Sequence, residues 1–180
     1  MVRHVPNVLT ILRLISVPLT VGLMAHGRAE AAFWLFVAAG VTDAVDGAVA
    51  RMFDAKSRLG MWLDPLADKA LLVSVYVTLA VQGVLPLWLV VLVALRDVLI
   101  VLYALVYLLA GTFAGTPLFI SKINTAAQLA LAALVLAHQG LGWGRPVLVD
   151  IFVIVVAVTT TASGTAYLMA ASRNVPAKDP

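Results

Sequence analysis

Four aspartates in the first half of the chain have the spacing of a site for divalent metals. Asp43 and Asp46 are three residues apart in the sequence. Asp64 and Asp68 follow them and are four residues apart. At either spacing the two members of a pair lie on one face of a helix. Four carboxylates at close range repel one another unless protons or cations lie between them. Because all the donors are oxygens, with no His or Cys nearby, the cluster favours Mg2+, Mn2+ or Ca2+ over zinc.

Two such cations side by side suit a reaction at phosphorus, since they can clamp the attacking and leaving oxygens of a displacement. The residues around the aspartates fit a nucleotide partner. Gly47 and Gly60 allow a close approach of the backbone. Ala50 keeps the groove open, and Arg51 can hold a phosphate through two parallel hydrogen bonds. A buried acidic cluster that only caps helices or pairs with basic residues would not need these glycines.

The elements that position these groups are membrane spans. The chain has 180 residues, of which 63% are hydrophobic and 12% charged, whereas a soluble domain carries about 25% charged residues. A soluble fold of this size cannot hide so much apolar surface, so lipid must cover most of it. The net charge of +3 is spread along the chain. It does not form the basic stripe that nucleic-acid binding needs.

Six segments are long enough to cross the hydrocarbon core of a bilayer, which predicts an all-α integral membrane fold of six helices. They run over residues 7–25, 30–52, 60–82, 85–110, 121–139 and 147–171. Because there is no internal repeat and no long linker, we expect one domain over residues 1–180. The four aspartates fall near the two ends that the short 53–59 connection joins, so the acidic faces of two antiparallel helices converge at one depth.

The Lys and Arg residues of the connections predict the orientation. If both termini are cytoplasmic, six of them lie inside and two outside. The six are Arg3, Lys56, Arg58, Lys122, Arg173 and Lys178, and the two are Arg28 and Arg145. The first apolar run is long for a signal peptide and is followed by a poor cleavage site, and no mitochondrial presequence is visible. We therefore predict a bacterial inner-membrane protein with a cytoplasm-facing active site.

The full pattern around the aspartates is Asp-x2-Asp-Gly-x2-Ala-Arg-x8-Gly-x3-Asp-x3-Asp, from Asp43 to Asp68. Here the sequence resembles the CDP-alcohol phosphotransferase family, and it matches every fixed position of the family signature. The resemblance implies an enzyme that cleaves a CDP-linked alcohol, releases CMP and passes the phosphatidyl or similar group to an acceptor hydroxyl. It also implies a homodimer.

The resemblance assigns roles to the four aspartates. Asp43, Asp46 and Asp64 would be ligands of two divalent cations, Mg2+ or Mn2+, with Ca2+ as a possible occupant. Asp68 would be both a shared metal ligand and the general base that deprotonates the acceptor hydroxyl. A carboxylate suits that role only if a metal makes the hydroxyl more acidic.

The same resemblance implies contacts to the CDP moiety at the entry to the first span and around the signature. These residues are Asn7, Thr10, Gly47, Arg51, Ser57 and Gly60. For Asn7 and Thr10 the alternative is a helix cap beside a snorkelling Arg13.

Further segments, residues 64–69, 96–98 and 120–125, look most like the branch of CMP-forming cardiolipin synthases. That branch implies CDP-diacylglycerol as donor and phosphatidylglycerol as acceptor. The alternative is a phosphatidylglycerophosphate synthase, which uses a polyol-phosphate acceptor, glycerol 3-phosphate. A soluble phosphorylated acceptor needs a cluster of basic groups. The chain has few of these near the predicted site, which favours the lipid acceptor.

Arg96 and Lys122 are the candidates for binding the acceptor or lipid phosphate. Arg96 lies well inside the fourth span, where an unpaired arginine is costly. Either it binds a phosphate, with Asp97 or another carboxylate orienting it, or it forms an internal ion pair that fixes helix packing. Lys122 is likewise either a phosphate contact or an ordinary positive-inside anchor.

A small cation transporter is an alternative from another class. Its acidic groups would lie at the middle of the membrane, on repeated or broken helices. Here the aspartates cluster at one interface and no inverted repeat is present, so the enzyme is favoured.

Overall fold

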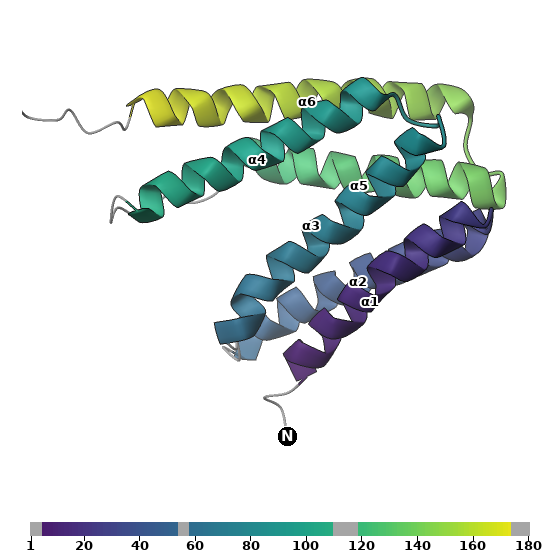
Figure 1. Cartoon of the computed structure of the whole chain (residues 1–180), viewed down its shortest axis with the longest axis horizontal. Helices are drawn as coiled ribbons and strands as arrows, with labels where there is room; N and C mark the ends of the chain where they lie inside the picture. Colours follow the sequence, from purple (N-terminus) through teal and green to yellow (C-terminus); the bar gives the residue numbers. More distant parts are fainter. Residues whose placement is uncertain (1–4, 54–57, 110–118, 174–180) are drawn as a thin grey trace, which may run out of the picture. The chain divides into compact units, whose positions relative to one another are not determined.

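The computed structural model describes residues 5–53, 58–109 and 119–173, and the side chains of residues 12–42, 69–106 and 119–172. Six helices occupy these ranges, and they contain no strand (Figure 1). The helices are α1 (Val5–Ala25), α2 (Ala29–Phe53), α3 (Arg58–Val81), α4 (Leu87–Leu109), α5 (Phe119–Leu141) and α6 (Pro146–Arg173). Each end lies within two residues of the end of a predicted span. The all-α prediction is confirmed.

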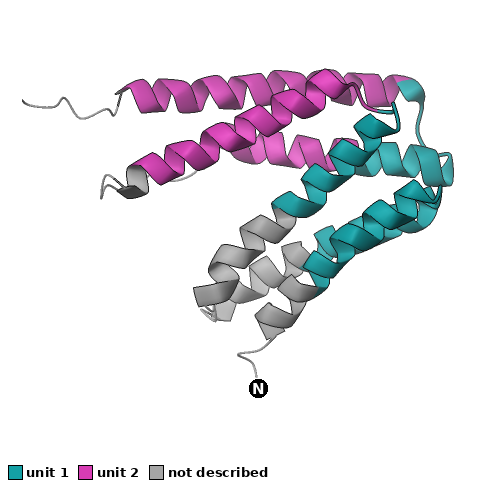
Figure 2. Cartoon of the chain, in the orientation of Figure 1, with its two compact units in different colours: residues 1–84, 132–146 teal, residues 85–131, 147–180 magenta. Residues whose placement is uncertain are grey.

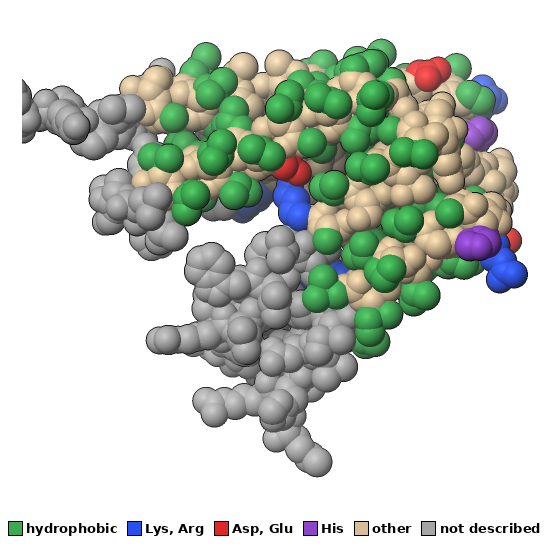
Figure 3. All heavy atoms as spheres, viewed as in Figure 1, with side chains coloured by type: hydrophobic (Ala, Val, Ile, Leu, Met, Phe, Trp, Pro, Cys, Tyr) green, Lys and Arg blue, Asp and Glu red, His purple; other side chains and the backbone are tan. Residues whose placement is uncertain are grey.

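Three helices are long and apolar enough to cross a membrane over the residues whose side chains are described. These stretches are Leu87–Val106, Phe119–Leu141 and Pro146–Ser172. Shorter apolar stretches, Leu12–Ala25, Ala29–Thr42 and Lys69–Val81, occupy the described parts of α1, α2 and α3. Hydrophobic side chains lie along the described helices in Figure 3, with few charged ones among them. The protein is therefore a membrane protein, and its six-span topology stays a prediction.

The helices form two compact units, coloured separately in Figure 2. Unit 1 comprises residues 1–84 and 132–146, and unit 2 comprises residues 85–131 and 147–180. In unit 1, α1 packs against both α2 and α3. Unit 2 contains α4, the first half of α5 and most of α6. Helix α5 is thus divided between the two units.

Two helices of unit 1 end in the same glycine motif. Gly27 follows α1 with φ 71°, and Gly83 follows α3 with φ 72°, a conformation that glycine adopts without steric cost. Directly after Gly27 in the sequence, the Arg28 N–H donates to the carbonyl oxygen of Leu23 at 2.8 Å. The corresponding bond behind Gly83 runs from Val84 N–H to Leu79 O at 2.9 Å. Both bonds satisfy carbonyls that the helix end would otherwise leave unpaired.

The ends of α1 and α3 are also joined directly. The side-chain amide Nε2 of Gln82 donates to the carbonyl oxygen of Met24 at 3.0 Å. Met24 lies in the last turn of α1, and its carbonyl oxygen also accepts from the Gly27 N–H at 3.1 Å. The Gln82 amide is therefore a second donor to this carbonyl, and it links the two helix ends. The helix ends at Gly27 and Gly83 therefore also lie where α1 and α3 meet in unit 1.

Among the described glycines of unit 1, Gly140 permits the closest helix approach. A Cβ placed there would lie 2.6 Å from the carbonyl carbon of Ala29 and would also overlap the backbone of Glu30. Since both contacts are backbone atoms, no side-chain rotation can relieve them. The last turn of α5 and the first turn of α2 are thus in contact through a position where any side chain is excluded.

We expect Gly140→Ala to destabilise the protein by about 1–3 kcal/mol, the usual cost of overpacking. The matched control is Gly22→Ala in α1, where a Cβ has nothing within 4 Å. In a helix interior that control should be neutral or stabilising by up to about 1 kcal/mol. Thermal unfolding of both variants in detergent measures the difference. Equal unfolding temperatures would show that α2 and α5 do not make this contact.

Candidate functional site

The four signature aspartates lie on two consecutive helices, as predicted. Asp43 and Asp46 belong to α2, and Asp64 and Asp68 belong to α3. From the rise per residue of a helix, one member of each pair lies about 10 Å, and the other about 15 Å, from the helix end that borders residues 54–57. The two pairs therefore stand at matching distances from the α2–α3 connection. The side chains of the four aspartates lie outside the described ones. Their convergence into one cluster therefore stays a prediction.

The predicted CDP contacts also fall outside the described side chains. Asn7 and Thr10 lie in α1, Gly47 and Arg51 in α2, and Gly60 in α3, whereas Ser57 belongs to the residues that are not described. All the elements that carry them belong to unit 1, where α1 packs against α2 and α3. Among the residues whose side chains are described, no group of His, Asp or Glu is arranged to hold a metal.

A buried polar face on α1 lies one to three turns beyond these N-terminal residues. Arg13 and Ser16 are each 6% exposed, and Thr20 is fully buried. The hydroxyls are satisfied within the helix: Ser16 Oγ donates to Arg13 O at 2.6 Å and Thr20 Oγ1 to Ser16 O at 2.7 Å. The burial of Arg13 does not fit a side chain that snorkels to the membrane surface. The roles of Asn7 and Thr10 stay predictions, because their side chains lie outside the described ones.

Arg96 donates four side-chain hydrogen bonds in unit 2. It lies near the middle of α4 and is 4% exposed. Its NH1 donates to Asp97 Oδ1 at 2.8 Å, which closes an ion pair between neighbours in the sequence. Its Nε and NH2 donate to Ser163 Oγ at 3.1 and 2.7 Å, and NH2 also donates to Ser121 Oγ at 2.5 Å. One guanidinium thus joins α4, α5 and α6.

A second polar contact lies one turn further along α5. The carbonyl oxygen Oδ1 of Asn124 accepts hydrogen bonds from the hydroxyls of Thr159 and Thr160, both at 2.9 Å. Asn124 is fully buried and Thr160 is 1% exposed. Thr159 and Thr160 lie in α6, and these bonds show that this polar stretch of α6 contacts α5. Serine and threonine in lipid-embedded helices commonly act in this way.

Lys122 differs from Arg96 in its exposure. It lies in the first turn of α5 and is exposed, whereas its neighbour Ser121 is turned toward Arg96. Consecutive helical residues point about 100° apart. The structure therefore gives the two candidate phosphate residues different surroundings, one enclosed by hydrogen-bond partners and one open.

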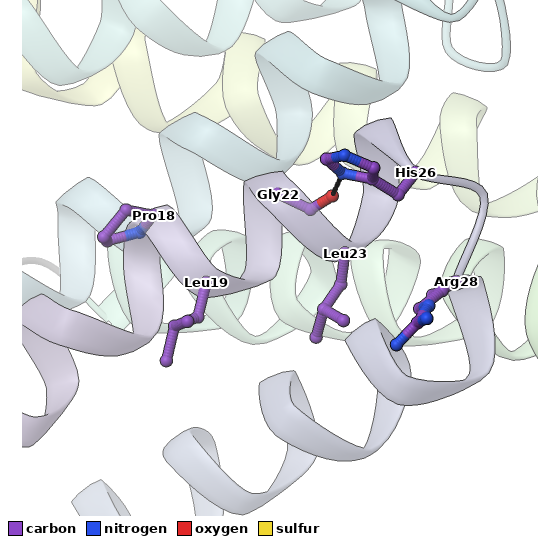
Figure 4. Close-up of a pocket in the computed structure, with 6 residues that line it drawn as sticks. All are labelled: Pro18, Leu19, Gly22, Leu23, His26 and Arg28. Carbon is purple, nitrogen blue, oxygen red and sulfur yellow. Dashed lines mark hydrogen bonds between the residues drawn. The ribbon is translucent and has the colours of Figure 1, made fainter.

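A shallow apolar groove of about 350 Å³ follows one face of α1 (Figure 4). Its lining residues are Pro18, Leu19, Gly22, Leu23, His26 and Arg28. At its end, the His26 Nδ1–H donates to the carbonyl oxygen of Gly22 at 2.7 Å. Arg28 precedes Asp43 by 15 residues of nearly continuous helix, which corresponds to about 22 Å. The groove is therefore not part of the aspartate site.

Comparison with known proteins identifies the class of enzyme. Residues 3–173, which include every predicted site residue, match the family of CDP-alcohol phosphatidyltransferases. The chain belongs to that family. The match confirms the resemblance drawn from the aspartate signature, and it makes the chain a phosphatidyltransferase-type enzyme rather than a cation transporter.

The names of individual relatives indicate two different activities. The chain is 38% identical to the cardiolipin synthase (CMP-forming) / mitochondrial hydrolase fusion protein of Schizosaccharomyces pombe, over 94% of this chain and 31% of the relative. It is 33% identical to the cardiolipin synthase (CMP-forming) of Rattus norvegicus, over 91% of this chain and 60% of the relative. It is 30% identical to a probable phosphatidylglycerophosphate synthase of Mycobacterium tuberculosis, over 97% of this chain and 84% of the relative. The chain thus spans about a third to three fifths of the length of the cardiolipin synthases it matches.

The Asn124 contact can be tested with a nearly isosteric substitution. Thr160→Val removes the buried hydroxyl that donates to α5, and we expect a loss of about 0.6–1.7 kcal/mol, as for other polar contacts between membrane helices. The control is Thr161→Val, because the exposed Thr161 hydroxyl donates to Ala157 O of its own helix. Thermal unfolding in detergent should be lowered more by the first substitution than by the second. If both substitutions lower the unfolding temperature equally, the Thr160 hydroxyl does not stabilise a contact between α5 and α6.

Proposed function

We propose that this chain transfers the phosphatidyl group of CDP-diacylglycerol to phosphatidylglycerol, which yields cardiolipin and CMP. The observation that carries the proposal is the similarity to CMP-forming cardiolipin synthases over more than nine tenths of the chain, at 33–38% identity. Few Lys and Arg residues lie near the predicted site, which supports a lipid acceptor. The phosphodiester of such a lipid carries a single charge, whereas a soluble phosphomonoester needs more cationic partners.

In the proposed reaction the acceptor hydroxyl oxygen attacks the phosphorus that carries the diacylglycerol. A new P–O bond forms to phosphatidylglycerol, and the P–O bond to CMP breaks with the electron pair leaving on CMP. The hydroxyl proton passes to the Asp68 carboxylate. Arg51, Gly47 and Gly60 would hold the CDP phosphates, and Asn7, Thr10 and Ser57 would border the nucleotide.

The donor set fits two hard divalent cations, because four carboxylates supply oxygen ligands only. Asp43, Asp46 and Asp64 would hold them together with Asp68. When bound, Mg2+ or Mn2+ would neutralise the charge that develops on the phosphate oxygens and make the acceptor hydroxyl more acidic. Lys122, exposed in the first turn of α5, would contact the acceptor phosphate.

The proposal includes an orientation and a setting. The positive charges of the loops support an orientation in which both termini and the aspartates lie at the cytoplasmic face of a bacterial inner membrane. The acceptor and donor are then both lipids of that membrane, and each reaches the site laterally. We also propose that the chain acts as a homodimer, as the family resemblance implies.

A second candidate is transfer to glycerol 3-phosphate, with phosphatidylglycerophosphate as product. It is favoured by the 30% identity to the Mycobacterium tuberculosis protein, of which this chain covers 84%. The aspartate chemistry would be the same in both reactions, because the acceptor differs only in what is attached to the attacking hydroxyl.

One assay separates the two acceptors. Purified protein is incubated with CDP-diacylglycerol, Mg2+ and either phosphatidylglycerol or glycerol 3-phosphate, and the lipid product is identified by mass spectrometry. We expect cardiolipin and CMP in equal amounts with phosphatidylglycerol. Formation of phosphatidylglycerophosphate without cardiolipin would establish the second candidate instead.

The same assay tests the base. Asp68→Asn should lower the rate of CMP release by about 10²–10⁴, the usual contribution of general base catalysis. The matched control is Asp150→Asn, because Asp150 is exposed in the first turns of α6 and should tolerate the change. If Asp68→Asn still released CMP at the full rate, the assignment of Asp68 would be wrong.

A further inference from the structure

The hydrogen-bond inventory of Arg96 leaves little for an external anion. A guanidinium carries five N–H groups. The contacts to Asp97, Ser121 and Ser163 number four, so one N–H remains. The strong arrangement for phosphate or carboxylate is a fork of two parallel N–H bonds, which a single donor cannot make.

The charge of Arg96 is likewise compensated inside the protein. Asp97 supplies an opposite charge at 2.8 Å, and the two side chains are 4% and 12% exposed. In lipid an isolated charge is costly, so ionisable residues within spans pair with one another or face a polar interior. Two serine hydroxyls complete the shell, and one of them, Ser163, is fully buried. Arg96 and Asp97 therefore form a neutral cluster.

We propose that Arg96 is a positioning residue: with Asp97 as its counter-charge, its hydrogen bonds to Ser121 and Ser163 fix α4 to α5 and α6. These bonds thereby orient the first turn of α5, which carries Lys122. Ser121 is held against the guanidinium, so the next residue along the helix is turned away from the cluster. Lys122 is exposed at that place. The consequence for the acceptor rests on the proposed function, in which Lys122 contacts the acceptor phosphate, whereas the consequence for helix packing does not.

A cycle of neutral substitutions distinguishes positioning from phosphate binding. Arg96→Gln removes the positive charge that Arg96 places beside Asp97, and Asp97→Asn removes the negative charge that Asp97 places beside Arg96. Each single variant should lower the unfolding temperature. Each should also raise the KM for phosphatidylglycerol about three- to twentyfold, the range that polar contacts between membrane helices correspond to. The double variant Arg96→Gln/Asp97→Asn restores a neutral, hydrogen-bonded pair, so it should lie closer to wild type than either single variant in both measurements.

The opposite pattern would overturn the proposal. If Arg96 binds the acceptor phosphate, the double variant should have as high a KM as Arg96→Gln, and Asp97→Asn should have the smaller effect. If the double variant lies closer to wild type than the single variants in unfolding temperature but not in KM, the positioning role is wrong. Ser163→Ala should weaken the cluster. Its control, Ser172→Ala, should not, because the exposed Ser172 hydroxyl donates to Met169 O of its own helix.

Lys122→Gln separates this proposal from the proposed function. It should raise the acceptor KM without changing the unfolding temperature. If Lys122→Gln leaves the KM unchanged, the acceptor contact and the positioning of Lys122 both fail, while the coupling in unfolding temperature still reports on helix packing. If the acceptor proves to be glycerol 3-phosphate, the cycle is run with that acceptor and the same pattern is expected.

Discussion

A charge buried in lipid must be compensated within the protein or by a bound ion, and this constraint explains the polar residues of both units. In unit 2, Arg96 meets it through Asp97 and two serine hydroxyls from other helices. In unit 1 the signature places four carboxylates on α2 and α3 within about 15 Å of the helix ends. In the proposed function, divalent metals would lie between these carboxylates and compensate their charge.

The two solutions differ in what they allow. A cluster closed by its own side chains is neutral and rigid, and it stabilises one arrangement of α4, α5 and α6. A cluster closed by metals keeps open coordination positions, which substrate oxygens can fill. In the proposed roles, this difference would distinguish the charge of Arg96, which positions helices, from the carboxylates that take part in the chemistry. The helix α5 contributes to both units, with Ser121 and Lys122 in unit 2 and Gly140 against the backbone of α2 in unit 1.

Much of the fold could be predicted because apolar length and glycine breaks are local signals. The helix ends lie within two residues of the predicted spans, and Gly27 and Gly83 end helices where breaks were expected. The partners of Arg96 could not be predicted, since Ser121 and Ser163 are 25 and 67 residues away in the sequence. The burial of Arg13 likewise depends on neighbouring helices. The aspartate site follows from its signature alone, since its side chains lie outside the described ones.

Electron paramagnetic resonance of the purified protein with Mn2+ tests whether the four aspartates bind a pair of metals, as proposed. Two cations held by shared carboxylates should bind with a stoichiometry of two per chain and show the altered spectrum of a spin-coupled pair, and Asp64→Asn should abolish the coupling. A protein that binds no Mn2+, or binds only isolated ions that Asp64→Asn does not affect, while it still releases CMP from CDP-diacylglycerol, would contradict the account.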